Sequence, residues 1–167
     1  MYTKEELKAQ IHKIIDNNIS MIYRISFQNV KNKEAAEDIV QEAFIKLLET
    51  EKTFNDEEHI KAWLITVTIN LCRDYYRNNI RHKIVPIEGV VINNGDGISD
   101  EYIDLLNALY SLRKNYSLIL YLYYYEEYTI QEIANMMNKT KSTINTWLRR
   151  ARSELSEILT KDGRYSK

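Results

Sequence analysis

Residues that break helices are scarce in this sequence, and most of them fall in one short stretch. Its 167 residues include only 4 Gly and 1 Pro, and Pro86 and three of the glycines lie between residues 84 and 99. Because glycine and proline are the strongest turn signals, the rest of the chain has few places to end a helix. The pattern predicts an all-α protein with two small helical domains, at residues 1–83 and 100–162, joined by a flexible linker at 84–99.

The remaining composition is that of a globular protein and contains little that could perform chemistry. Hydrophobic residues make up 44% of the chain, but no apolar run could span a membrane and no signal-peptide core is present. The single cysteine, Cys72, excludes an internal disulfide. His12, His59 and His82 lack metal-ligand spacing, and there is no phosphate-binding glycine loop or nucleophile elbow. We therefore expect a cytoplasmic protein without membrane insertion, metal, cofactor or enzymatic activity.

Charge is segregated along the chain, although the net charge is only −1. Residues 61–83 carry +4 and residues 139–167 carry +5, whereas residues 1–60 carry −4 and residues 84–138 carry −6. Two separate basic blocks are typical of a chain that meets phosphate at two places. Uneven solvated faces on long helices would give the same distribution, so charge alone does not separate the two interpretations.

Capping signals and apolar periodicity locate the helices. Thr3 and Glu6 have the form of a capping box, and apolar residues recur at helical spacing from Leu7 to Tyr23. Further helices are expected at 34–49, from the Asn55–Glu58 cap to about Asn79, and at about 100–113, 115–127, 129–137 and 142–160. The run Leu118–Tyr125 has high strand propensity. Since helices flank it and no strand is nearby to pair with, we predict a fully buried helix instead.

The most specific pattern is that of a helix–turn–helix. Thr129 and Glu132 form a second capping box, Asn138 stands where the chain must turn, and another helix begins near Ser142. Core positions on that second helix share one face of a helical wheel: Ile144, Trp147, Leu148, Ala151 and Leu155. Residues suited to base edges and phosphates lie on the opposite face: Ser142, Asn145, Thr146, Arg149 and Arg150. DNA binding is the predicted role, and a helical hairpin with a solvated basic face is the alternative.

A second polar surface follows the helix around Trp63. Its stripe contains the residues Trp63, Thr66, Asn70, Arg73, Asp74 and Arg77. An otherwise apolar helix with a narrow stripe of this kind suits unpaired bases, with Trp63 available for stacking. The alternative is a core helix whose stripe is only its solvent edge. Cys72 falls on the apolar side and is expected in the core.

The helix at 34–49 has a third surface, which is acidic. Its core face is formed by Ala36, Ile39, Val40, Ala43, Phe44 and Leu47. The opposite face places Asp38, Gln41, Glu42 and Glu49 around Ile45. An exposed isoleucine among carboxylates suggests a docking surface for a basic partner helix, although single exposed apolar residues are common.

Three stretches together resemble one family. Helices of sigma-70-type RNA polymerase sigma factors are similar to three segments of this chain: residues 36–44 (AEDIVQEAF), residues 62–70 (AWLITVTIN) followed by Asp74 and Arg77, and residues 129–152. Their order resembles the small two-domain extracytoplasmic-function class. The family pattern differs at three places: the turn residue Asn138, Trp147, and the pair Leu112–Arg113. These departures bear on which promoter sequence is expected more than on the resemblance to the family.

The resemblance implies specific roles. Asp38 and Gln41 match positions that dock on the clamp helices of the polymerase largest subunit. A set in the Trp63 helix matches positions that open and read the minus-ten element: Asn70, Arg73, Asp74 and Arg77. The loop at about 50–55 matches the place where a flipped base is captured. The minus-thirty-five element would be read by Asn145, Thr146, Arg149 and Arg150.

Core RNA polymerase and promoter DNA are therefore the expected partners, and the sequence leaves open whether an anti-sigma factor also binds. Two other functions compete with a sigma factor. A stand-alone helix–turn–helix regulator would explain residues 129–152, but neither the Ile45 face nor the Trp63 helix. A helical interaction protein would have no role on DNA.

Overall fold

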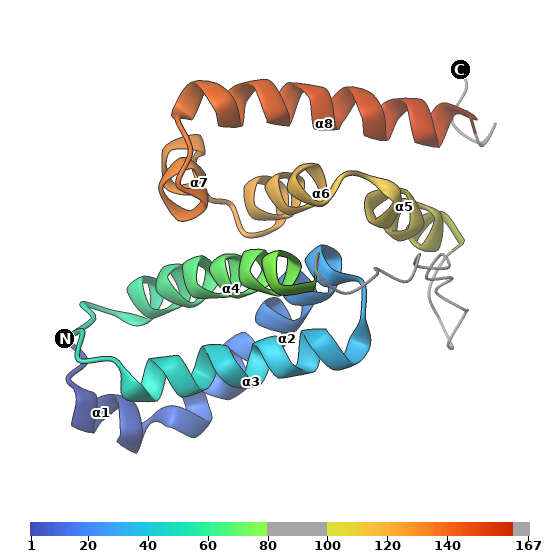
Figure 1. The fold of residues 1–167 in the computed structure, drawn as a ribbon. Helices are drawn as coiled ribbons and strands as arrows, with labels where there is room; N and C mark the ends of the chain where they lie inside the picture. Colours follow the sequence, from blue (N-terminus) through green and yellow to red (C-terminus); the bar gives the residue numbers. More distant parts are fainter. Residues whose placement is uncertain (80–99, 162–167) are drawn as a thin grey trace. The chain divides into compact units, whose positions relative to one another are not determined.

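The computed structural model describes residues 1–79 and 100–161, with side chains from Leu105 onward in the second range (Figure 1). The chain divides into two compact units, Met1–Val85 and Pro86–Lys167. Secondary structure in the described ranges is helical apart from one isolated β-bridge, so the all-α prediction is confirmed. The predicted linker at 84–99 lies outside the described residues.

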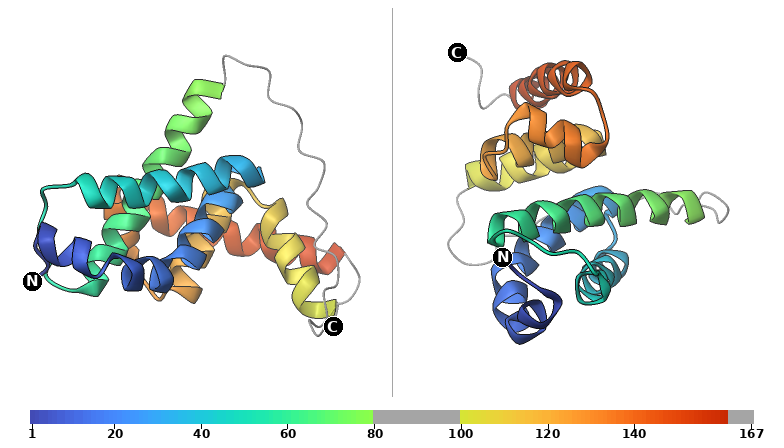
Figure 2. Two further views of the ribbon diagram at one scale, coloured as in Figure 1. Left: turned by 90° about the horizontal axis from the view of Figure 1, so that it is seen from below. Right: turned by 90° about the vertical axis from the view of Figure 1, so that its left-hand side faces the viewer.

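The first unit is a helical bundle. Its helices are α1 (Lys4–Ala9), α2 (Ile11–Val30), α3 (Lys33–Glu49) and α4 (Glu57–Asn79). The last three pack on one another, as both views of Figure 2 show, and α1 contacts α3. Ile22, Leu47 and Leu64 are fully buried at their centre. Cys72 is 2% exposed, which confirms its predicted place in the core.

Local capping explains where these helices begin and end. The predicted capping box at Thr3 is present, with the Glu6 carboxylate accepting from the Thr3 N–H at 2.8 Å. The apolar periodicity predicted no interruption after Thr3, but the helix breaks at Gln10, which caps α1 and precedes α2. Lys31 ends α2 in the left-handed conformation, and Asn32 then caps α3 by accepting from the Ala35 N–H at 2.8 Å.

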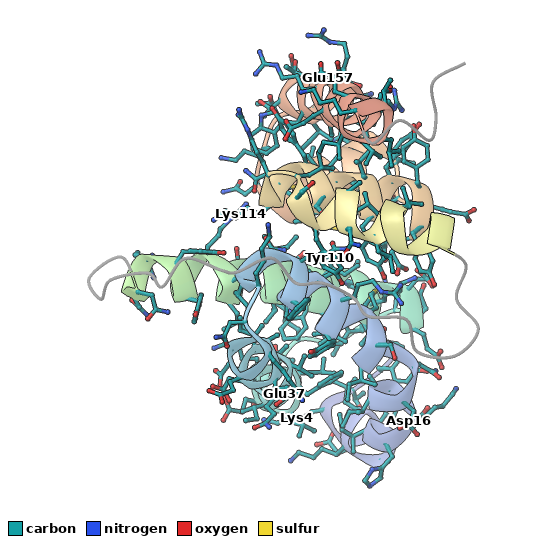
Figure 3. The ribbon with its side chains drawn as sticks, turned by 90° about the vertical axis from the view of Figure 1, so that its right-hand side faces the viewer. Lys4, Asp16, Glu37, Tyr110, Lys114 and Glu157 are labelled. Atoms are coloured by element: carbon teal, nitrogen blue, oxygen red, sulfur yellow. The ribbon has the colours of Figure 1, made fainter. Side chains whose placement is uncertain are left out.

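The second unit contains the helix–turn–helix. It comprises α5 (Asp100–Ser111), α6 (Lys114–Leu120), the π-helical turn η1 (Tyr121–Tyr125), α7 (Ile130–Met137) and α8 (Lys141–Lys161). Helices α5, α6 and α7 each pack on α8. Ile119, Leu122, Ile133 and Ile144 are fully buried between them. Figure 3 shows charged side chains such as Asp16 and Glu157 pointing outward from α2 and α8, where both are exposed.

The run Leu118–Tyr125 is helical, but the prediction that it is fully buried is wrong. It ends in a π turn, in which the Glu126 N–H donates to the Tyr121 carbonyl at 3.1 Å. Tyr124 is 58% exposed and Tyr125 is 65% exposed. Eight consecutive large residues cannot all face one core from a helix, because successive side chains point around its circumference. Among the described residues, no helix is both long and apolar enough to cross a membrane.

Candidate functional site

Helix α3 carries the predicted docking residues on one outward face. All six predicted core residues of α3 are buried, with Ala36, Ala43 and Leu47 at 0% exposure. Opposite them, Asp38 and Gln41 are exposed, and Ile45 is 46% exposed. The structure therefore brings this set together as the sequence predicted.

Of the other two residues predicted on this face, Glu49 is exposed, whereas Glu42 is half-buried and already paired. Its carboxylate lies 3.3 Å from the Lys46 ammonium, one turn along α3. Asp38 and Glu42 also line a shallow groove between α3 and α4, together with Glu34, Leu71 and Tyr75. Sequence reasoning missed the last three residues, because the groove exists only where α4 packs against α3. The groove therefore extends the predicted docking face from α3 toward α4.

The polar stripe of α4 forms an ordered row from Asn70 to Arg77. An Arg73 guanidinium nitrogen donates to the Asn70 side-chain oxygen at 3.4 Å, and an Arg77 nitrogen donates to the Asp74 carboxylate at 2.8 Å. Asn70, Arg73 and Arg77 are exposed, and Asp74 is half-buried. These i,i+3 contacts hold the two guanidinium groups over the helix surface. Each arginine therefore remains accessible beside a polar neighbour.

Thr66 and Trp63 begin this stripe and are half-buried. The Thr66 hydroxyl donates to the Ala62 carbonyl at 2.9 Å, which leaves its oxygen as an acceptor. The Trp63 ring meets the ring of Phe54 edge-on, with 5.7 Å between centroids. Phe54 is fully buried and belongs to the loop that precedes α4. Trp63 therefore joins the stripe to the loop at 50–55.

Helix α8 presents the predicted DNA face. Ile144, Leu148 and Ala151 are buried. Thr146, one of the predicted DNA residues, is half-buried. The other four are exposed: Ser142, Asn145, Arg149 and Arg150. The exposed and buried residues alternate with the period that the helical wheel predicts. Two predicted core residues, Trp147 and Leu155, are half-buried rather than buried, because they lie at the margin of the packed face.

The turn between α7 and α8 fixes the direction of that face. Asn138 is left-handed, with φ 51° and ψ 52°, and the following Lys139 N–H donates to the Ala134 carbonyl at 2.9 Å. Asparagine tolerates this conformation better than most residues, which explains how it can stand at the family's glycine position. Thr140 then caps α8 by accepting from the Thr143 N–H at 3.1 Å.

Sequence reasoning missed an arginine–tyrosine cluster beside α8. The Arg152 guanidinium lies over the Tyr123 and Tyr124 rings, 5.7 and 5.5 Å from their centroids, and its Nε donates to the Tyr124 hydroxyl at 2.6 Å. The residues are 28 positions apart. Their meeting depends on how η1 packs near α8, so the sequence pattern contained no signal for it.

Comparisons with known proteins match both units. The family model Sigma-70 region 2 matches residues 14–82, and Sigma-70, region 4 matches residues 102–155. RNA polymerase sigma factor SigV of Bacillus subtilis (strain 168) is 30% identical over 164 residues, covering 97% of this chain and 98% of that protein. RNA polymerase sigma factor YlaC of the same strain is 27% identical, covering 87% of this chain and 94% of the relative.

A solved structure shares the fold. The sigma factor RpoE in complex with the anti-sigma factor NepR from Bartonella quintana superposes with a TM-score of 0.72 at 23% identity, covering 90% of this chain and 96% of that chain. Both family regions thus occur in order, and one relative is matched almost end to end. The chain belongs to the sigma-70 family of RNA polymerase sigma factors, in the extracytoplasmic-function class, whose members direct core RNA polymerase to promoters.

Proposed function

We propose that three surfaces divide the work of promoter recognition. The outer face of α3 binds core RNA polymerase, α4 and the loop before it read the minus-ten element, and α8 reads the minus-thirty-five element. One observation carries this assignment. On α3 and α8, the polar residues that the family motifs single out stay exposed, apart from the half-buried Thr146, while the opposite face of each helix is buried in its own core.

The α3 face has the chemistry of a protein interface. Asp38 and Gln41 offer carboxylate and amide groups to a basic partner helix, and Ile45 adds an exposed apolar contact at their centre. Complementary charge sets the orientation of such a contact, while buried apolar area stabilises it. Glu42 and the groove beside it would extend the contact toward α4.

The α4 stripe suits DNA whose strands have separated. Arg73 and Arg77 supply positive charge for phosphates, and Asn70 and Thr66 supply hydrogen-bonding groups for bases. Trp63 lies next to the loop at 50–55, so an unpaired base held by that loop would lie close to an aromatic ring. In the free protein Asp74 holds Arg77 in place at 2.8 Å.

The α8 face suits the major groove of double-stranded DNA. It offers Asn145 and Thr146 at base edges and two guanidinium groups, Arg149 and Arg150, for guanines or phosphates. We further propose that the protein works in the cytoplasm and contributes no catalytic step of its own, since polymerisation belongs to core polymerase.

In vitro transcription tests this function against a stand-alone DNA-binding regulator. Core RNA polymerase is supplied with this protein and a library of promoters randomised at both elements, and the transcripts are sequenced. A sigma factor yields transcripts only when both proteins are present, and their templates share two sequence elements. A stand-alone regulator would instead shift DNA without polymerase, and its addition would select no common promoter.

A further inference from the structure

The first thirteen residues lie outside the stretch that the region 2 family model matches, which begins at residue 14. They nevertheless contact the loop to which the proposed function assigns minus-ten base capture. Tyr2 and Phe54 form an isolated antiparallel β-bridge, in which the Phe54 N–H donates to the Tyr2 carbonyl at 3.1 Å and the Tyr2 N–H donates to the Phe54 carbonyl. A strand-like contact therefore joins the start of the chain to the loop.

Side chains reinforce this bridge on both sides. Lys4 forms an ion pair with Glu51 inside the loop. Lys13 lies 2.6 Å from the Glu57 carboxylate, in the first turn of α4. The Tyr2 hydroxyl donates to the same Glu57 carboxylate at 3.3 Å. Tyr2, Lys4 and Lys13 thus hold both the loop and the start of the helix that follows it, and we refer to these three residues as the N-terminal clamp.

Two short-range hydrogen bonds also hold the loop: the Lys52 N–H donates to the Thr50 hydroxyl oxygen at 3.2 Å, and the Asn55 N–H donates to the His59 Nδ1 at 3.3 Å. Residues 51–53 are exposed and lie between the end of α3 and Phe54 without helical structure. Phe54 itself is fully buried, with its ring 5.2 Å from the His59 ring and 5.7 Å from the Trp63 ring. One end of the exposed stretch is therefore fixed by Phe54 and the bridge, and its start by the Lys4–Glu51 ion pair.

We propose that the N-terminal clamp is a specificity-determining element, in which Tyr2 acts as a positioning residue for minus-ten recognition. This inference rests on the proposed function of the loop. A pocket for a single base discriminates only when its groups are held in place, because a loose site accepts several bases with similar energies. The clamp supplies that rigidity from outside the matched family region.

The test uses the full-length protein with core RNA polymerase and two promoter libraries, one randomised at the minus-ten element and one at the minus-thirty-five element. Tyr2→Pro removes the backbone donor of the bridge, whereas the matched control Tyr2→Phe keeps that donor and loses only the phenol hydroxyl. Lys4→Glu breaks the ion pair with Glu51. The double variant Lys4→Glu with Glu51→Lys restores opposite charges at the same two positions.

For Tyr2→Pro we expect the preference at the loop-read base to fall by about five-fold, equivalent to roughly 1 kcal/mol. The minus-thirty-five preference, the affinity for core polymerase and the melting temperature should stay close to wild type. Tyr2→Phe should keep most of the preference, and the charge swap should recover what Lys4→Glu loses.

Two outcomes would overturn the inference. An unchanged minus-ten preference in Tyr2→Pro would show that the clamp does not act on the loop, and equal losses at both promoter elements would show a purely structural role. The failure of the proposed function has a different signature. In that case the wild-type protein itself would select no base at the minus-ten element.

Discussion

The exposed side chains of α8 project from a helix whose other face is core. Because Arg149 and Arg150 are exposed while Leu148 beside them is 2% exposed, neighbouring positions separate the proposed DNA contacts from the residues that stabilise the fold. Substitutions on the exposed face should change promoter use, and those on the buried face should change stability.

We expect Arg149→Ala and Arg150→Ala each to lower transcription from the preferred promoter without changing the melting temperature. An arginine that contacts a guanine contributes roughly 1–3 kcal/mol of discrimination, and one that contacts phosphate contributes salt-dependent affinity. Transcription measured at two salt concentrations distinguishes the two roles. Lys161→Ala, at the far end of α8, serves as the charge-matched control. If neither arginine affects promoter use, α8 does not read DNA.

Trp147 lies at the margin of the packed face of α8, so its replacement should cost less stability than that of a fully buried residue. Full burial of a large aromatic would make its replacement by alanine cost about 3–5 kcal/mol. Since Trp147 is half-buried, we expect Trp147→Ala to destabilise the second unit by about 2 kcal/mol, in proportion to the apolar area that it covers. Denaturant unfolding measures this loss. A negligible loss combined with lost promoter binding would place Trp147 on the DNA face instead.

The proposed docking face of α3 can be tested in the same way. Asp38→Ala combined with Gln41→Ala should weaken binding to core polymerase while helicity and melting stay near wild type, because both side chains are exposed. Fluorescence titration with core polymerase gives the affinity. Asp16→Ala, which removes an exposed carboxylate from α2, is the control. Equal affinity in the variant and the control would remove the docking role from this face.

Whole helices were predictable where their signals are local. Both capping boxes join residues three apart, so the sequence contains each donor and acceptor. The break at Gln10 has neither glycine nor proline to announce it, and apolar periodicity continues across it. The π turn buries Tyr121 and leaves Tyr124 and Tyr125 exposed, a division that depends on tertiary packing. Tyr2 and Phe54 pair although they are far apart in the sequence, and no local pattern predicts such a pair.

The second capping box, formed by Thr129 and Glu132, should contribute to the stability of α7. Thr129→Ala removes the hydroxyl that accepts from the Glu132 N–H at 3.3 Å, and we expect a loss of about 1 kcal/mol of stability. Thr129→Ser keeps the hydroxyl and should remain near wild type. Chemical denaturation of the three proteins provides the comparison. A loss of equal size in Thr129→Ser would assign the effect to the missing methyl group.

The same cap should respond to pH. Hydrogen bonds from Thr129 hold the pKa of Glu132 below its ordinary value of 4.5. A carboxylate whose pKa is lower in the folded state stabilises fully above the unfolded value, and this contribution is lost as the pH falls through the folded value. Stability measured between neutral and acidic pH should therefore decline less steeply in Thr129→Ala than in Thr129→Ser.

At the scale of the whole molecule, each unit buries its own core. Leu64 belongs to the first unit and Leu148 to the second, at 0% and 2% exposure. Since multidomain chains often unfold in more than one step, we expect calorimetry to show two transitions. Leu64→Ala should lower the temperature of one transition and Leu148→Ala that of the other. Each variant should lose about 2–5 kcal/mol of unfolding free energy in its own unit. Equal shifts of both transitions by either variant would mean that the cores unfold together.

The bridge between Tyr2 and Phe54 has a practical consequence for anyone who purifies the protein. An affinity tag fused before Met1 would place foreign chain one residue away from the Tyr2 N–H, which donates to the Phe54 carbonyl. If the bridge positions the loop, such a tag alters promoter preference in assays. A tag placed after the last residue, beyond α8, leaves the Tyr2–Phe54 bridge untouched and is the better choice for recombinant work.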